Sequence, residues 1–98
     1  MLINQKFMLC RYYGNEQNVF VDAEIDDGSL CITTEITREN NFKSNIITLY
    51  FDKENTKKLF SLIKIKDFKD EFCGVKGLKK LEQFCKTNKI ISKVKKDF

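Results

Sequence analysis

Acid–base chemistry in this chain would have to come from carboxylates, because its 98 residues include no histidine. Histidine is the side chain that most often transfers protons in enzymes near neutral pH. Asp22 and Glu24 are two residues apart, so on a strand their carboxylates would share one face. That face is predicted to contact water, where carboxylates are poorly suited to donate protons at neutral pH. We therefore interpret the pair as part of a solvated acidic face rather than as a catalytic dyad.

The cysteines are the other candidates for nucleophilic or metal chemistry. Cys10, Cys31, Cys73 and Cys85 are far apart in the sequence and form no C-x-x-C pair. A structural zinc site usually takes two ligands from such a pair, and no histidine could complete a mixed set. Cys73 could be exposed near the start of a helix, but the sequence offers no base to activate it. We predict free structural thiols, mostly buried, and neither a metal nor a cofactor.

Nucleotide-binding and hydrolase motifs are missing as well. The sequence contains no GxxxxGK[ST] loop, no GxGxxG after a predicted strand and no GxSxG elbow. Its four glycines are better suited to turns and helix ends. We therefore expect that the protein is not an enzyme.

Charge is distributed unevenly along the chain. Residues 1–51 contain four basic and seven acidic residues, a net charge of −3, whereas residues 52–98 contain fourteen lysines and seven acidic residues, a net charge of +7. Fields of one sign steer charged partners toward a surface without specifying the fold. The imbalance therefore points to two candidate contact surfaces, one acidic and one basic.

The basic half makes nucleic-acid binding the alternative function. Its candidate residues, on the last predicted helix and in the C-terminal tail, are Lys79, Lys80, Lys86, Lys93 and Lys96. Phosphate contact without base reading needs little more than such a surface. Base reading favours arginine and side-chain amides, and single-strand binding favours aromatic residues between the cations. Because a charged helix face is usually only solvated, we expect weak nucleic-acid binding at most.

A hairpin centred on Asp27 and Gly28 is the clearest local structure, because this pair suits the positive φ angles of a type I′ turn. The turn sets the register of residues 19–26 against residues 29–36. Alternation of side chains then predicts one buried face. Its members are Val19, Val21, Ala23, Ile25, Leu30, Ile32, Thr34 and Ile36.

The opposite face of the hairpin gathers acids around one aromatic residue. Such a face is commonly only solvated, but an aromatic anchor among acids also fits a basic groove on another protein. A polar segment, residues 37–44, contains one further large apolar residue that could either cover the core or contact a partner. The candidate protein-binding residues are Phe20, Asp22, Glu24, Glu35 and Phe42.

Residues 5–13 and 45–51 are predicted to be two further strands, which completes a four-stranded antiparallel meander. Asp52 can cap a first helix whose apolar stripe includes Leu62, Asp67 can cap a second, and residues 78–87 form a third. The tail after residue 88 can add a short edge strand. We predict one α+β domain over residues 1–98, with two or three helices packed on one sheet face.

Together these features predict a small non-enzymatic protein-binding module. An inhibitor or adaptor of the kind that phages and mobile elements encode, acting on a basic surface of a nucleic-acid-handling protein, would use the acidic face. A homodimer is also compatible with the pattern. No apolar run reaches the roughly 18–20 residues needed to span a bilayer, and the first residues lack the features of a signal peptide. We therefore expect a soluble, cytoplasmic protein without membrane contacts.

Overall fold

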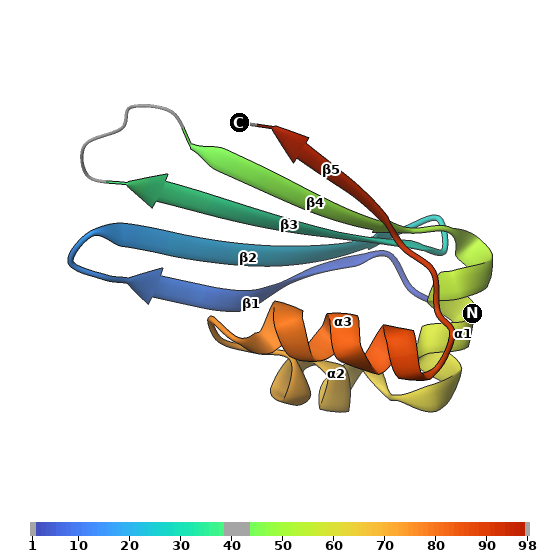
Figure 1. Ribbon diagram of the computed structural model, residues 1–98. Coiled ribbons are helices and arrows are strands. Elements are labelled where there is room, and N and C mark those ends of the chain that lie inside the picture. Colours follow the sequence, from blue (N-terminus) through green and yellow to red (C-terminus); the bar gives the residue numbers. More distant parts are fainter. Residues whose placement is uncertain (1, 39–43, 98) are drawn as a thin grey trace.

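A five-stranded antiparallel sheet and three helices make up the computed structural model, which describes residues 2–38 and 44–97 (Figure 1). The strand order is β1-β2-β3-β4-β5, so each strand pairs with its neighbour in the sequence of strands. The elements in chain order are β1 (Gln5–Tyr13), β2 (Gln17–Asp26), β3 (Ser29–Arg38), β4 (Asn45–Phe51), α1 (Lys53–Leu62), α2 (Ile65–Glu71), α3 (Gly77–Thr87) and β5 (Lys93–Asp97). The predicted α+β fold is confirmed, including the C-terminal strand.

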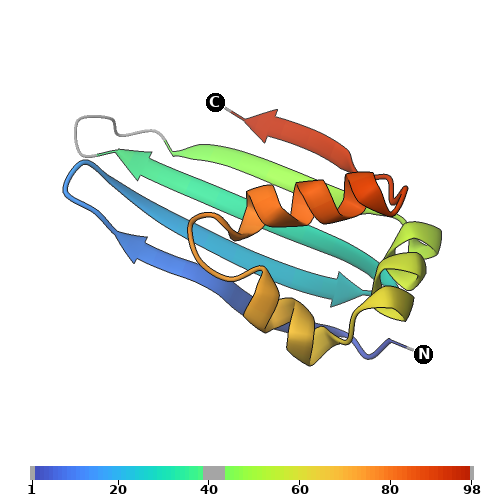
Figure 2. The same cartoon turned by 60° about the horizontal axis from the view of Figure 1, so that its bottom comes forward.

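The helices lie on one side of the sheet. Figures 1 and 2 show α2 and α3 across one face and α1 at one end of the sheet. The opposite face carries no helix of the described chain. An antiparallel sheet tolerates this arrangement because its alternating side chains can be apolar on one face and polar on the other.

The β2–β3 hairpin has the predicted turn and register. Asp26 pairs with Ser29, and the pairing continues without interruption to Gln17 and Arg38. Asp27 and Gly28 have φ angles of 50° and 80°, as a type I′ turn requires. A two-residue turn of this type matches the right-handed twist of the strands, so the turn itself fixes which side chains face the helices.

One apolar cluster joins the sheet to the three helices. Each helix contributes a side chain that is at most 1% exposed, namely Leu59 from α1, Phe68 from α2 and Leu81 from α3. The Phe68 ring has edge-on contacts to the rings of Phe60 and Phe72 at centroid distances of 5.3 and 5.1 Å. The aromatic residues of the three helices and their ends, Phe60, Phe68, Phe72 and Phe84, are therefore used in the core or packed against it.

Asp52 and Thr56 connect α1 to the sheet. The Asp52 carboxylate accepts a hydrogen bond from the backbone N–H of Asn55, which confirms the predicted cap. Thr56 is fully buried, and its hydroxyl donates to the carbonyl of Phe51 and accepts from the N–H of Leu30. The end of β4 and the start of β3 are thus held against the first turns of α1.

The segment that leads into β5 is anchored on α1. The side-chain oxygen of Asn55 accepts a hydrogen bond from the N–H of Ile91, and the ammonium of Lys58 donates to the carbonyl of Lys89. Ile90, between these two contacts, is buried in the core. These contacts direct the chain from the end of α3 to the free edge of β4, where β5 pairs.

A β-bulge interrupts β1. Met8 pairs with Asp22 and Cys10 pairs with Val21, so Leu9 is an extra residue on its strand. Both Leu9 and Cys10 are buried, and the carbonyl of Leu9 accepts a hydrogen bond from the N–H of Gly74. The bulge exchanges the two faces of β1, because every residue after Leu9 lies on the opposite side from the one that simple alternation predicts.

Three details of the predicted helices differ from the structure. The second helix starts at Ile65 rather than after a cap at Asp67, and its N-cap residue Lys64 makes no side-chain capping hydrogen bond. Leu62, placed on the apolar stripe of α1, is 53% exposed because α1 ends there and Ile63 already has an extended backbone. The third helix begins at Gly77, one residue earlier than predicted, and ends before Asn88 as expected.

Candidate protein contact surface

We call the sheet face opposite the helices the open face, and the strand register defines its central residues. They form three rows of five, each running across the sheet from β1 to β5 (Figure 1). The first row is Lys6, Glu24, Cys31, Tyr50 and Lys93. The second row is Met8, Asp22, Thr33, Thr48 and Lys95. The third row is Arg11, Phe20, Glu35, Ile46 and Asp97.

Basic and acidic side chains are equally frequent in these rows. The four basic ones come from the two edge strands, whereas three of the four acids come from β2 and β3. The open face is therefore mixed in charge. The hairpin alone had indicated an anionic face. From the sequence, β1 was predicted beside β2 in the meander and the tail as an edge strand, but no register was assigned to either, so their basic residues were not placed on this face.

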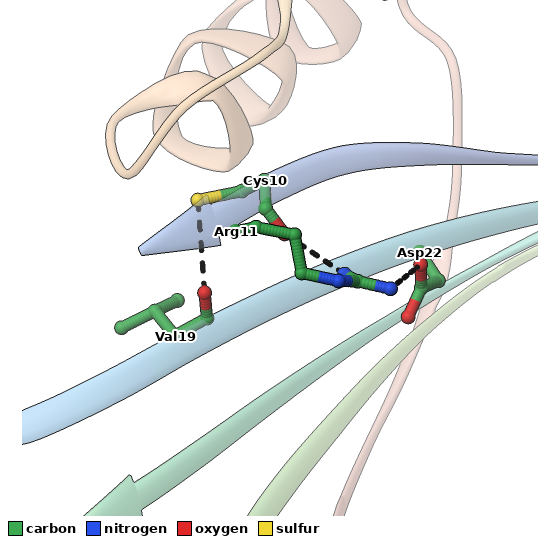
Figure 3. Close-up of polar contacts among 4 residues, drawn as sticks. All are labelled: Cys10, Arg11, Val19 and Asp22. Atoms are coloured by element: carbon green, nitrogen blue, oxygen red, sulfur yellow. Dashed lines mark hydrogen bonds and ion pairs between the residues drawn. The ribbon is translucent and has the colours of Figure 1, made fainter. Parts of the chain in front are cut away.

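Arg11 organises the part of the open face around Phe20. Its guanidinium donates to the carboxylate of Asp22 at 2.7 Å and to the carbonyl of Cys10 at 2.9 Å (Figure 3). The same guanidinium lies 5.3 Å from the centroid of the Phe20 ring, within range of a cation–π contact. The ring of Tyr13 also meets Phe20 edge-on, at a centroid distance of 5.5 Å. Phe20 is half-buried and contacts these two side chains of β1.

Arg11 and Tyr13 are residues of the open face that the sequence interpretation did not identify. They reach the open face because of the bulge at Leu9, which shifts the alternation of β1 by one residue. A signal is present in the sequence, where Phe7, Met8, Leu9 and Cys10 form a run of four apolar residues that breaks the alternation of the strand. Such a run is consistent with a bulge but does not locate it.

The remaining candidate residues are placed as follows. Glu24 is exposed, with Lys6 as its register partner on β1, and Glu35 is half-buried beside Phe20. Phe42 lies outside the described residues. Of the five predicted protein-binding residues, four therefore share the open face, and Asp22 is already paired with Arg11.

The centre of the first two rows of the open face is uncharged. Cys31 and Thr33 on β3 pair with Tyr50 and Thr48 on β4. Cys31 and the two threonines are half-buried although no helix covers them, because neighbouring strands shield these small side chains. Tyr50 is 46% exposed. In the first two rows, a strip two strands wide and without charge therefore separates the acids of β2 from the lysines of β5, whereas the third row has Glu35 on β3.

The five lysines of the nucleic-acid alternative do not form one surface. Lys79, Lys80 and Lys86 are exposed on α3. Lys93 belongs to the open face, whereas Lys96 pairs with Ile47 and points to the helix side of the sheet. The sheet itself therefore separates Lys93 from the other four.

Hollows beside α3 bring carboxylates close to its lysines. A hollow of about 440 Å³ between α2 and α3 is lined by Lys80 together with Asp67 and Glu71. Another, of about 340 Å³, lies between α3 and the strands β4 and β5 and is lined by Lys86 and Glu82. These acids offset the attraction of the lysines for phosphate groups.

The four thiols differ in burial, so the prediction of mostly buried cysteines holds for only half of them. Cys10 and Cys85 are buried, Cys31 is half-buried, and Cys73 is exposed. Burial raises the pKa of the Cys85 thiol to about 11 and also raises the pKa of Cys10. In residues 2–38 and 44–97, no three cysteine, aspartate or glutamate side chains are grouped in a way that could hold a metal ion.

Across the described residues, no helix is long and apolar enough to cross a membrane. Searches of protein-family models, curated proteins and solved structures found no match to the chain. We therefore infer the function from the geometry of the molecule itself.

Proposed function

We propose that this protein is a small non-enzymatic module that binds another protein through its open face. The observation that carries the proposal is Phe20, in contact with Arg11 and Tyr13 on a face that no described helix covers (Figure 1). Aromatic and arginine side chains supply much of the binding energy at protein interfaces. Because Arg11 and Phe20 already hold each other in place, binding would cost little side-chain entropy.

The balance of charge on the open face favours a partner that is itself mixed in charge. A partner with one strongly basic groove would meet the acids of β2, but it would also meet the basic residues of β1 and β5. Like charges at an interface cost several kcal/mol, as an order of magnitude. We therefore favour a partner surface that presents cations opposite β2 and anions opposite the edge strands.

Nucleic-acid binding has weaker support. The lysines of α3 share their surroundings with carboxylates, and the tail lysines point to both sides of the sheet. Treatment of the lysate with nuclease distinguishes the two functions, because a partner held through nucleic acid is lost and a directly bound protein is retained.

The proposal is tested by affinity capture from nuclease-treated lysate with three versions of the tagged chain. The double variant Asp22→Lys/Glu24→Lys reverses the acids of β2, and Lys79→Glu/Lys80→Glu reverses an equal number of charges on α3 as a matched control. We expect one protein to be retained by the wild-type chain and by the control, and its affinity for the open-face variant to fall at least tenfold. Loss of the partner only in the α3 variant, or only with nuclease, would contradict the proposal. Thermal melts establish that each variant is folded.

A further inference from the structure

We propose that a second copy of this chain binds the open face and forms a two-fold symmetric dimer. This inference depends on the proposed function, because it names the partner of the same surface. It comes from the arrangement of charge across four of the five strands. A surface forms a symmetric dimer with itself only if a two-fold rotation places complementary groups opposite one another.

The open face has the required order of charges. In the first row, Glu24 on β2 and Lys93 on β5 are the outer members of a run of four, and Cys31 and Tyr50 lie between them. The second row repeats the order, with Asp22 and Lys95 at its ends and two threonines between them. Both rows therefore read acid, neutral, neutral, base.

A two-fold axis parallel to the strands and midway between β3 and β4 brings the acidic end of each row opposite the basic end of the same row in the second copy. Rotation about it places β2 opposite β5 of the second copy and β3 opposite β4, and it leaves each row opposite itself. Glu24 then faces Lys93 of the second copy, and Asp22 faces its Lys95, with both contacts repeated by symmetry. The uncharged strip of one copy covers the strip of the other, in the aligned face-to-face packing that sheets adopt about 10 Å apart.

Other two-fold axes in the plane of the interface do not pair both acids of β2 with lysines. An axis along β2 places Asp22 and Glu24 opposite themselves, and an axis across the strands leaves β2 opposite β2 of the second copy, which contains no lysine. An axis along β3 places Lys6 opposite Lys93 of the second copy. The axis between β3 and β4 is therefore the one that places both acids opposite lysines.

The dimer should be weak. Four strands about 4.8 Å apart, with seven residues in β4 at about 3.3 Å each, give a footprint of about 19 Å by about 23 Å. The area of this footprint is smaller than that of a standard specific interface, in which each partner buries roughly 800 Å². We therefore expect a dissociation constant in the micromolar range, and weaker association at high salt because the flanking ion pairs are exposed.

Sedimentation velocity of the purified full-length chain, from about ten micromolar upward, measures the association. We expect the wild-type chain to change from monomer to dimer with concentration. Each reversal on its own, Asp22→Lys/Glu24→Lys or Lys93→Glu/Lys95→Glu, should weaken dimerisation at least tenfold, because it places like charges opposite one another. The α3 control variant Lys79→Glu/Lys80→Glu should dimerise like the wild type.

Mixing the two reversed variants is the decisive step. One variant then carries bases on both β2 and β5 and the other carries acids on both, so the mixture should form a one-to-one heterodimer although each variant alone is monomeric. The proposal is overturned if the wild-type chain remains monomeric up to millimolar concentration, or if the mixed variants fail to associate while thermal melts show both to be folded. If the monomeric chain still captures another protein through the open face, only the identity of the partner is wrong and the proposed function stands.

Discussion

The cysteine thiols of this protein differ in burial and therefore in their access to solvent. The thiol of Cys85 is buried in the core and its pKa is raised to about 11, whereas Cys73 is exposed at the end of α2. Reaction with an alkylating agent requires both access and the thiolate form. The structure therefore ranks the thiols by reactivity without assigning chemistry to any of them.

Alkylation at pH 8 tests this ranking. We expect Cys73 to be modified first, Cys31 more slowly, and Cys10 and Cys85 only when the protein unfolds, because the two buried thiols are both shielded and raised in pKa. Mass spectrometry of peptides after timed quenching gives the four rates. Modification of Cys85 as fast as Cys73 in the folded protein would show that Cys85 is not buried in the core.

Thr34 is a polar residue on the helix side of β3. It is 5% exposed, and its hydroxyl has no hydrogen-bond partner among the described residues. Burial of a hydroxyl without a partner costs free energy, so Thr34→Val, which keeps the shape, should raise the free energy of unfolding by about 1 kcal/mol. Chemical denaturation measures the change, with Thr33→Val on the open face as the matched control. A loss of stability in Thr34→Val would show that the hydroxyl is bonded.

At the scale of elements, the β2–β3 hairpin could be predicted in full because its determinants are local. Asp27 and Gly28 specify the turn, and the turn specifies the register. The bulge at Leu9 could not be predicted, because it depends on the pairing of β1 with β2 and on a hydrogen bond from Gly74. The start of α2 was missed for a similar reason, since packing of Phe68 in the core outweighs the capping preference of Asp67.

Substitution of Gly28 tests the turn. Gly28 has a φ of 80°, which a β-branched residue adopts only with strain, so Gly28→Val should lower the free energy of unfolding by about 1 kcal/mol or more. Space does not cause this loss, since the nearest atom to an added Cβ is 3.6 Å away on the flexible Lys53 side chain. Gly28→Asn, which tolerates positive φ, is the control and should lose less stability in the same denaturation experiment. Equal losses in both variants would argue against the type I′ turn.

Paired substitutions on β2 and β3 test which face of the sheet is the core. Ile32 is fully buried, so Ile32→Ala should cost about 2–5 kcal/mol of unfolding free energy. Asp22 is exposed and its ion pair with Arg11 is partly solvated, so Asp22→Ala should cost about 1 kcal/mol or less. Denaturant midpoints at equal m-values give both figures. The reverse order of the two losses would mean that the faces are assigned incorrectly.

At the scale of the whole molecule, the sequence was sufficient for the fold class but not for the character of the surface. Phe20, Asp22, Glu24 and Glu35 were correctly grouped, because they belong to one hairpin. Half of the basic residues of the open face come from β1 and half from β5. The lysines of β5 join this face only when β5 pairs with β4, and that docking depends on contacts between residues 36 positions apart, such as the hydrogen bond from Ile91 to Asn55. Charge counts along the chain cannot reveal such neighbours.

The same long-range docking creates the self-complementary order of charges. The chain brings Lys93 and Lys95 to the far side of a neutral strip from Asp22 and Glu24. If the open face is a contact surface, its centre must become inaccessible when the complex forms. Cys31 lies in that centre, and Cys73 lies on the other side of the sheet, so the protein contains both a reporter and an internal control.

The most direct test of the open face as a contact surface is therefore the alkylation rate of Cys31 relative to Cys73 as protein concentration increases. We expect the Cys31 rate to fall about fivefold at ten times the dimer dissociation constant, by mass action, while the Cys73 rate stays constant. The variant Asp22→Lys/Glu24→Lys should show no such fall. A Cys31 rate that is independent of concentration, and that is also unchanged when a captured partner protein is added, would contradict the assignment of the open face as the binding surface.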